Sequence, residues 1–199
     1  MTYQKCVIAL LLFSSQPVSA ANFSYTGSFS TDSDVQFFDF SITSDSTSVI
    51  INTLSLNGGL NLAGDQIAAG GFNSYLSLWD QSSGAWVFNT PNDIPGEAVI
   101  SSIGTLLAGN YILALSQFDN VAAGTNLSDG FAAALSLTSF DPSLPFAING
   151  GGGSGHWAVD IQNVDNASII SAVPLPGSFG FIVSGLLGLA SLTLRKATA

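Results

Sequence analysis

Hydrophobic and polar residues alternate in short runs along the middle of the chain. Phe38, Phe40 and Ile42 alternate with Asp39 and Ser41, and residues 49–56 form a second run rich in β-branched side chains. A period of two places alternate side chains on opposite faces of a β-strand. Turn signals such as Asp-Gln-Ser-Ser-Gly at 80–84 separate the runs. No run before the C-terminal tail has the 3.6-residue period of an amphipathic helix.

These short strands predict an all-β domain, an antiparallel β-sandwich or jelly roll. In the run at 75–80, Leu76 and Leu78 should face one way, and Tyr75, Ser77 and Trp79 the other. A hairpin turn should follow at 80–84. The expected strands lie at residues 23–29, 38–42, 49–56, 75–80, 85–89, 98–103, 111–117 and 157–161.

Residues 1–20 have the organisation of a secretory signal peptide. Lys5 supplies the positive charge, residues 7–13 form a short apolar core, and Val18-Ser19-Ala20 supplies small residues at a cleavage site. The apolar run is too short to span a bilayer. We therefore expect export by the Sec machinery, removal of the leader by signal peptidase and a mature domain over 21–172. The alternative is a buried N-terminal strand.

The C-terminal segment, residues 173–199, is expected to be a membrane-retention and sorting tail. It begins with Val173-Pro174-Leu175-Pro176, which stops a strand. Residues 179–194 are uncharged and rich in Gly, Leu and Ala, and about 24 Å long as a helix. Arg195 and Lys196 follow as a stop signal, which places the domain outside the inner membrane. The alternative is a final buried helix.

The charge distribution separates the ends of the chain from its middle. The three cations are Lys5, Arg195 and Lys196, whereas all thirteen acidic residues lie between Ala21 and Leu194. A domain without cations cannot neutralise phosphates, so we expect no nucleic-acid partner. The carboxylates form either a solvated acidic surface or a binding site for divalent cations. The single cysteine, Cys6, would leave with the leader.

The tail resembles the PEP-CTERM family of sorting signals. The resemblance rests on the Val-Pro-x-Pro motif at 173–176, the short apolar segment and the basic end. It implies processing near the motif by exosortase, a membrane peptidase of Gram-negative bacteria, and delivery to the cell surface or extracellular matrix. Leu175 departs from the family, where the usual motif has Glu, so permanent anchoring by an uncut helix remains open.

The middle of the chain resembles the bacterial pre-peptidase C-terminal domain, a small β jelly roll. The resemblance covers roughly residues 29–119 and rests on 34–40, 75–80 and 107–113 in that order. The stretch 115–131 is similar to a group of exported proteins that carry PEP-CTERM tails and have no assigned enzymatic activity. The resemblance implies an accessory or surface protein.

Residues that could perform catalysis are scarce. His156 is the only histidine, and its neighbour Ser154 is too close in sequence for a triad geometry. The glycine run at 150–153 lacks the lysine of a phosphate-binding loop. One histidine without mature cysteine cannot complete a zinc site. Substitution of Glu97 and Asp93 would test for glycan hydrolysis. The sequence nevertheless predicts that the protein is not an enzyme.

Calcium is the cofactor that the acidic residues could bind. Asp32 and Asp34 lie on one side of an extended segment, and Asp93 adds an oxygen ligand from a loop. The alternative for Asp32 is a turn or capping role.

The sequence therefore predicts a non-enzymatic surface or matrix protein that contributes to adhesion, biofilm or envelope structure. The alternative is a module that binds extracellular polysaccharide through Trp79, Trp86 and Trp157. Core packing is the commoner fate of aromatic residues on strands and is the other interpretation of these three tryptophans.

Overall fold

The computed structural model describes residues 20–90, 96–101, 104–132, 139–144 and 153–171. These residues form an all-β structure, in which the single helical element is the 3-10 turn η1 (Leu127–Asp129). Among them no helix is long and apolar enough to cross a membrane. The expected helix at 179–194, the sorting tail and all of the leader except Ala20 lie outside the described residues.

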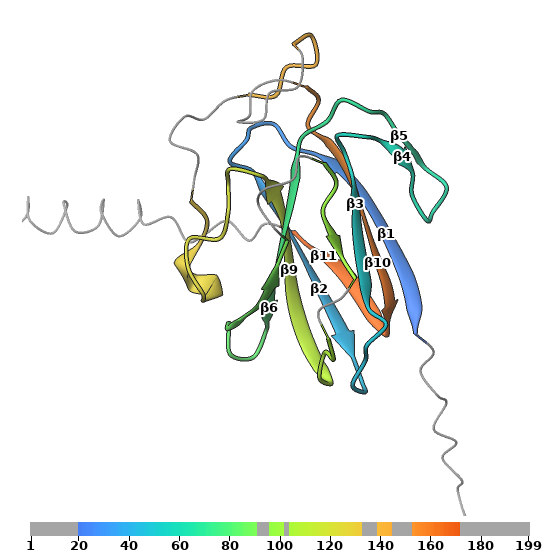
Figure 1. Cartoon of the computed structure of the whole chain (residues 1–199), viewed down its shortest axis with the longest axis vertical. Helices are drawn as coiled ribbons and strands as arrows, with labels where there is room; N and C mark the ends of the chain where they lie inside the picture. The colour runs from blue at the N-terminus through green and yellow to red at the C-terminus, as the bar shows by residue number, and fades with distance from the viewer. Residues whose placement is uncertain (1–19, 91–95, 102–103, 133–138, 145–152, 172–199) are drawn as a thin grey trace, which may run out of the picture.

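The strands form two main antiparallel sheets (Figure 1). The four-stranded sheet has the order β1 (Ala21–Ser28), β10 (His156–Val164), β3 (Ile50–Leu54) and β8 (Val99–Ile100). The five-stranded sheet has the order β11 (Asn166–Ile170), β2 (Val35–Ile42), β9 (Gly109–Gln117), β6 (Ser74–Asp80) and β7 (Trp86–Asn89). A small hairpin pairs β4 (Gly59–Leu60) with β5 (Gln66–Ile67).

The two main sheets enclose one hydrophobic core, as in a β-sandwich. Alternate residues of each strand enter it, which is the packing that the period of two predicts. Phe38 of β2 contacts Trp157 of β10 edge to face, with ring centroids 5.9 Å apart. The fully buried core residues include Phe38, Ile51, Leu76, Leu78, Ile100, Leu113, Leu115, Val159 and Ile161.

The chain changes sheet at almost every connection. β1, β3, β8 and β10 belong to one sheet and β2, β6, β9 and β11 to the other, while β6 and β7 are joined as a hairpin within the same sheet. The first strand therefore pairs with β10 and the last strand with β2. The turn at 80–84 closes the β6–β7 hairpin as predicted.

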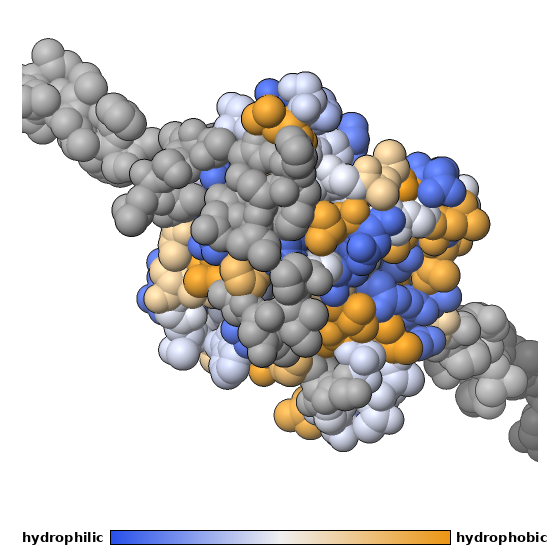
Figure 2. Space-filling view, turned by 45° about the horizontal axis from the view of Figure 1, so that its top comes forward, coloured by the Kyte–Doolittle hydropathy of each residue, from blue (hydrophilic) through white to orange (hydrophobic). Residues whose placement is uncertain are grey.

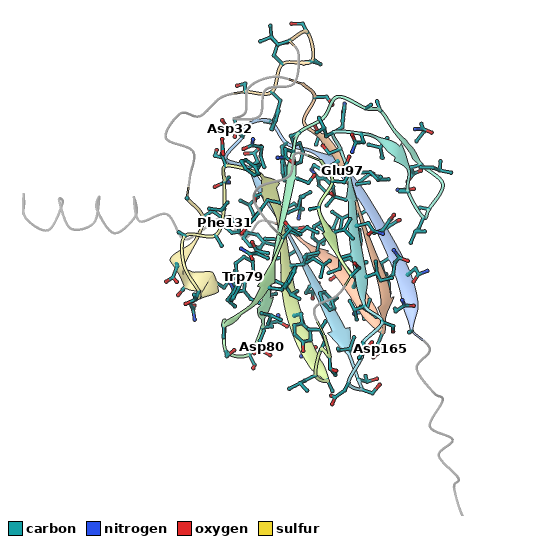
Figure 3. The ribbon with its side chains drawn as sticks, viewed as in Figure 1. Asp32, Trp79, Asp80, Glu97, Phe131 and Asp165 are labelled. Carbon is teal, nitrogen blue, oxygen red and sulfur yellow. The ribbon has the colours of Figure 1, made fainter. Side chains whose placement is uncertain are left out.

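A second, smaller core lies on the outer face of the five-stranded sheet. The loop after β9, residues 118–132, covers this face, and we call it the covering loop. Its Phe131 packs edge to face on the fully buried Trp79 of β6, with ring centroids 5.9 Å apart (Figure 3). Phe37 of β2 makes a similar contact with Phe131. Both faces of β6 are therefore buried, with Leu76 and Leu78 on one side and Trp79 on the other.

The remaining surface mixes hydrophobic and hydrophilic residues. On the face shown in Figure 2, hydrophobic residues are scattered among hydrophilic ones and form no single broad patch. Scattered apolar residues are normal on a protein surface and do not by themselves indicate an interface.

The sequence located most strands of the two sheets but missed three. β11 and the β4–β5 hairpin have no predicted counterpart, because β11 follows β10 after a single residue and the hairpin lies within the Gly-rich connection at 57–71. Phe29, assigned to the first strand, lies just beyond β1 in the main core.

Replacing Phe131 with alanine should expose the outer face of the five-stranded sheet. The truncation removes the ring that packs on Trp79 and Phe37, so we expect the free energy of unfolding to fall by about 2–4 kcal/mol. Urea unfolding followed by tryptophan fluorescence measures the change, and the native emission should shift to the red as Trp79 meets water. The control is Leu144→Ala, because Leu144 is 53% exposed. An unchanged midpoint and emission for Phe131→Ala would show that the covering loop does not protect this face.

Candidate functional site

Neutral donors bind the carboxylates of this domain, since residues 21–194 contain no Lys or Arg. Asp80 accepts hydrogen bonds from the Ser82 hydroxyl and from the hydroxyl and N–H of Ser83. These bonds favour the ionised form and lower the pKa of Asp80 to about 2. Similar bonds to hydroxyl, amide or backbone N–H groups are made by Asp34, Asp39, Asp45, Asp65, Glu97, Asp129, Asp141, Asp160 and Asp165.

Asp34, one of the three expected calcium ligands, has a structural role in the turn before β2. Its carboxylate accepts hydrogen bonds from the N–H groups of Ser30 and Thr31, at 2.6 and 3.0 Å, and from the Thr31 hydroxyl at 2.9 Å. These bonds fix the turn and point the carboxylate at the backbone. Asp93, another expected ligand, lies outside the described residues.

Asp32, the third expected ligand, is buried, with only 1% of its surface exposed. Figure 3 shows it at one end of the five-stranded sheet, opposite the end that holds Asp80 and Asp165. The register of the sheet explains its surroundings. Because Val35 of β2 pairs with Ser116 of β9, the residues just before β2 lie beside those just after β9. Asp32 therefore lies at the same sheet end as Asp119 and Asn120.

Electrostatic coupling joins Asp32 to Asp119. Burial, and then the charge of Asp32, raise the pKa of Asp119. Asp119 is half-buried and its N–H donates to Gln117 Oε1 at 3.1 Å. Within the described part of the chain its carboxylate accepts no hydrogen bond. Asp119 is thus partly buried and lies within electrostatic range of a second acidic residue, Asp32. No Lys or Arg of the domain can compensate these charges, because residues 21–194 contain none.

Asn120 completes this group. It is 1% exposed, and its Nδ2 donates to the Ser33 carbonyl at 2.9 Å, next to Asp32. Its Oδ1 is buried and has no hydrogen-bond partner. We call Asp32, Asp119 and Asn120 the acidic cluster. Further buried polar side chains at this sheet end are Asn73, Ser74, Ser116 and Gln117.

The acidic cluster offers hard oxygen atoms, which suit calcium or magnesium and not zinc. No group of three or more His, Cys, Asp or Glu side chains that could hold a metal occurs among the described residues. The cluster instead combines two carboxylates with an amide oxygen. No local sequence pattern joins Asp119 and Asn120 to Asp32, because β2 and β9 are separated by more than sixty residues of chain. A correct prediction of the pairing between β2 and β9 would have placed Asp32, Asp119 and Asn120 at the same end of the sheet.

Glu97, the acid considered for hydrolysis, holds backbone in place. Its carboxylate accepts hydrogen bonds from the N–H groups of Ser55 and Asn57, both at 2.8 Å, and from the Thr53 hydroxyl at 3.2 Å. Burial raises the pKa of Glu97 and these hydrogen bonds oppose the rise. The side chain thereby ties the segment before β8 to the end of β3.

His156 and Ser154 do not form a catalytic pair. His156 is exposed at the start of β10, and the Ser154 hydroxyl is buried without a hydrogen-bond partner, so neither side chain bonds to the other.

The three tryptophans do not form a platform for sugars. Trp79 is fully buried and Trp157 is 3% exposed, whereas Trp86 on the edge strand β7 is 44% exposed. The expectation of a three-tryptophan platform was wrong, because the alternation of β6 and β10 directs Trp79 into the outer core and Trp157 into the main core.

An open groove of about 520 Å³ lies between β1 and the strand β5. Its polar lining comes from Thr26, Ser28, Gln66 and His156.

Comparisons with known proteins leave the family open: no protein-family model and no curated protein matches this chain. The sorting motif Val173-Pro174-Leu175-Pro176 and the stop residues Arg195 and Lys196 lie outside the described residues.

The role of Glu97 predicts different outcomes for two substitutions. Glu97→Ala leaves the N–H groups of Ser55 and Asn57 without their acceptor, so the free energy of unfolding should fall by about 2–3 kcal/mol. Glu97→Gln keeps an acceptor oxygen and removes the buried charge, so it should stay within about 1 kcal/mol of the native protein at pH 7.

The pH dependence follows from the raised pKa of Glu97. The folded state binds the proton more tightly than the unfolded state, so this contribution to stability is full below the unfolded pKa. It is lost as the pH rises through the folded pKa. Between pH 7 and pH 5 the native protein should therefore gain stability relative to Glu97→Gln in urea unfolding. Parallel pH profiles for the two proteins would contradict this account.

Proposed function

We propose that this chain is an exported, non-enzymatic surface or matrix protein of a Gram-negative bacterium, with a jelly-roll domain and a tail sorted by an exosortase-type peptidase. In this proposal the domain contributes to adhesion, biofilm or envelope structure.

The strand order supports a jelly roll. When the small β4–β5 hairpin is left aside, the first eight strands divide into the orders 1-8-3-6 and 2-7-4-5, with β11 added beside the second strand. Two four-stranded sheets with these strand orders have the connectivity of a jelly roll, which consists of two Greek keys. The fold is a frequent scaffold for surface and binding proteins, and function on it depends on the sites that it carries.

The observation that carries the proposal is the agreement between the ends of the fold and the expected processing sites. β1 begins at Ala21, the first residue after the expected signal-peptide cleavage, and β11 ends at Ile170. Among the residues that the structure describes, all strands of both sheets fall inside the expected mature domain, 21–172. Removal of the leader and the tail would leave intact every strand pairing of the described part of the chain.

Mass spectrometry of the protein from its native cell surface tests the sorting proposal. We expect an N-terminus at Ala21, the first residue after the expected signal-peptide cleavage, and a C-terminus near residues 173–176, because the proposed peptidase would cut at the Val-Pro-x-Pro motif. Replacement of Pro174 and Pro176 by alanine should leave the tail uncut. An intact Arg195-Lys196 end on the mature surface protein would contradict processing and favour permanent anchoring.

Polysaccharide binding is the second candidate function, and the groove beside β1 favours it. The hydroxyl groups of Thr26 and Ser28, the Gln66 amide and the His156 imidazole can exchange hydrogen bonds with sugar hydroxyls. A glycan array should then show saturable binding that Gln66→Ala and His156→Ala reduce at least tenfold. Trp86→Ala is the control, because Trp86 does not line the groove. The absence of saturable binding to any glycan would leave the scaffold role.

A further inference from the structure

A pocket of about 340 Å³ opens where β1 begins. Ala20, the residue before β1, lines this pocket together with the loop that follows β2, and the two charged residues among its described lining are Asp45 and Asp165. Figure 3 shows Asp165 at the same end of the sandwich as the start of β1. The pocket is separate from the groove described above, which lies beside Thr26 and Ser28 at the other end of the same strand.

The register between β1 and β10 places Ala20 beside Asp165. Ala21 pairs with Val164 in these antiparallel strands, so the residue before Ala21 lies opposite the residue after Val164. Directly opposed residues of antiparallel strands have Cα atoms about 4.5–5.5 Å apart. The peptide bond between Ala20 and Ala21 therefore lies within reach of the Asp165 carboxylate, at the edge of a pocket that Asp45 also lines.

Each of the two carboxylates has capacity for a further donor. Within the described residues, the Thr43 N–H donates to Asp165 Oδ2, and the Ala108 N–H donates to Asp45 Oδ1 at 2.9 Å. The structure shows no hydrogen bond from these residues to Asp165 Oδ1 or Asp45 Oδ2. An ionised carboxylate has about four acceptor positions on its two oxygens, so one bond leaves most of them for other partners.

Removal of the leader creates a cationic donor at this place. The inference rests on the proposed export, in which signal peptidase cuts between Ala20 and Ala21. Hydrolysis transfers the oxygen of a water molecule to the Ala20 carbonyl, which leaves as a carboxylate, and both protons of the water to the Ala21 nitrogen. The uncharged amide nitrogen thus becomes an ammonium group with three N–H donors. Departure of Ala20 also removes one wall of the pocket.

We propose that this pocket is the binding site of the α-ammonium group of Ala21 in the processed protein, with Asp45 and Asp165 as its acceptors. The group brings a positive charge to a domain that has no Lys or Arg, so its ion pair has no competitor from those side chains. It joins the first residue of the edge strand β1 to the loops that follow β2 and β10. The precursor lacks this ion pair, and cleavage therefore stabilises the start of β1.

Competitive acylation of amino groups tests the inference. Residues 21–199 contain two amino groups, the α-amino group of Ala21 and the ε-amino group of Lys196. This leader-free chain is purified in detergent, its first residue is confirmed as Ala21 by mass spectrometry, and it is labelled with a small amount of acetic anhydride at pH 7. Only the unprotonated amine reacts, and adjacent carboxylates favour the protonated form. Lys196 serves as the internal reference in every sample.

The double variant Asp45→Asn/Asp165→Asn removes both charges and keeps the shape of the side chains. Labelling of Ala21 relative to Lys196 should rise about threefold to tenfold in this variant, because the amine loses the groups that hold its proton. Each single variant should give an intermediate ratio.

The matched control is Asp141→Asn, which makes the same charge change far from Ala21. Asp141 lies beyond the opposite end of β1, because the N–H of its neighbour Phe140 donates to the carbonyl of Ser30. Its labelling ratio should equal that of the native protein.

Thermal unfolding gives a second measurement, which separates the ion pair from structural damage. Complete acetylation of Ala21 removes the positive charge, so we expect it to lower the melting temperature of the native protein by about 1–3 °C. Acetylation of the double variant Asp45→Asn/Asp165→Asn should leave its melting temperature unchanged, whatever the stability of that variant.

Two results would overturn the inference: equal labelling ratios in the native protein and the double variant, or an equal effect of acetylation on both melting temperatures. Either result, obtained with Ala21 as the first residue, leaves the proposed export intact. A surface protein whose N-terminus is not Ala21 would instead overturn the proposed cleavage together with this inference. Mass spectrometry of the protein from the cell surface recognises that case before any labelling.

Discussion

The absence of cations between residues 21 and 194 governs the polar organisation of this domain. A carboxylate that cannot form an ion pair must find neutral donors, and serine, threonine and backbone N–H groups supply them. In most cases these donors lie in turns or at strand ends, so each acid fixes a local backbone conformation. Asp80 closes the β6–β7 turn in this way, and Glu97 joins the segment before β8 to β3. The acidic residues are thus part of the framework as well as of the surface.

One end of the five-stranded sheet gathers several buried polar residues. There Asp32 and Asn120 are buried, and the charge of Asp32 adds to the burial that raises the pKa of Asp119. The same end carries the start of the covering loop, whose Phe131 protects Trp79 on the outer face. The covering loop therefore contacts the sheet through polar groups at its start and through Phe131 near its end. The stability of the outer face depends on both contacts.

The sequence predicted what is local and missed what depends on pairing. Alternation predicted strands at 38–42 and 75–80, which lie within β2 and β6, and assigned Leu76 and Trp79 to opposite faces, because each side chain is directed by its own backbone. The burial of Trp79 could not be predicted from the local sequence, because it depends on the covering loop, which is distant in sequence and lies over this side chain. The acidic cluster was missed for the same reason, since only the β2–β9 register places Asp119 beside Asp32.

The pairing of β1 with β10 has a consequence for the order of events in folding. Ser24 and Asp160, which are hydrogen-bonded across these strands, are 136 residues apart in sequence. Neither main sheet can be completed before the C-terminal strands have joined, and structures dominated by such distant contacts form slowly. The chain should therefore remain unfolded while it is being synthesised, a state that can be threaded through a narrow channel before the two sheets close.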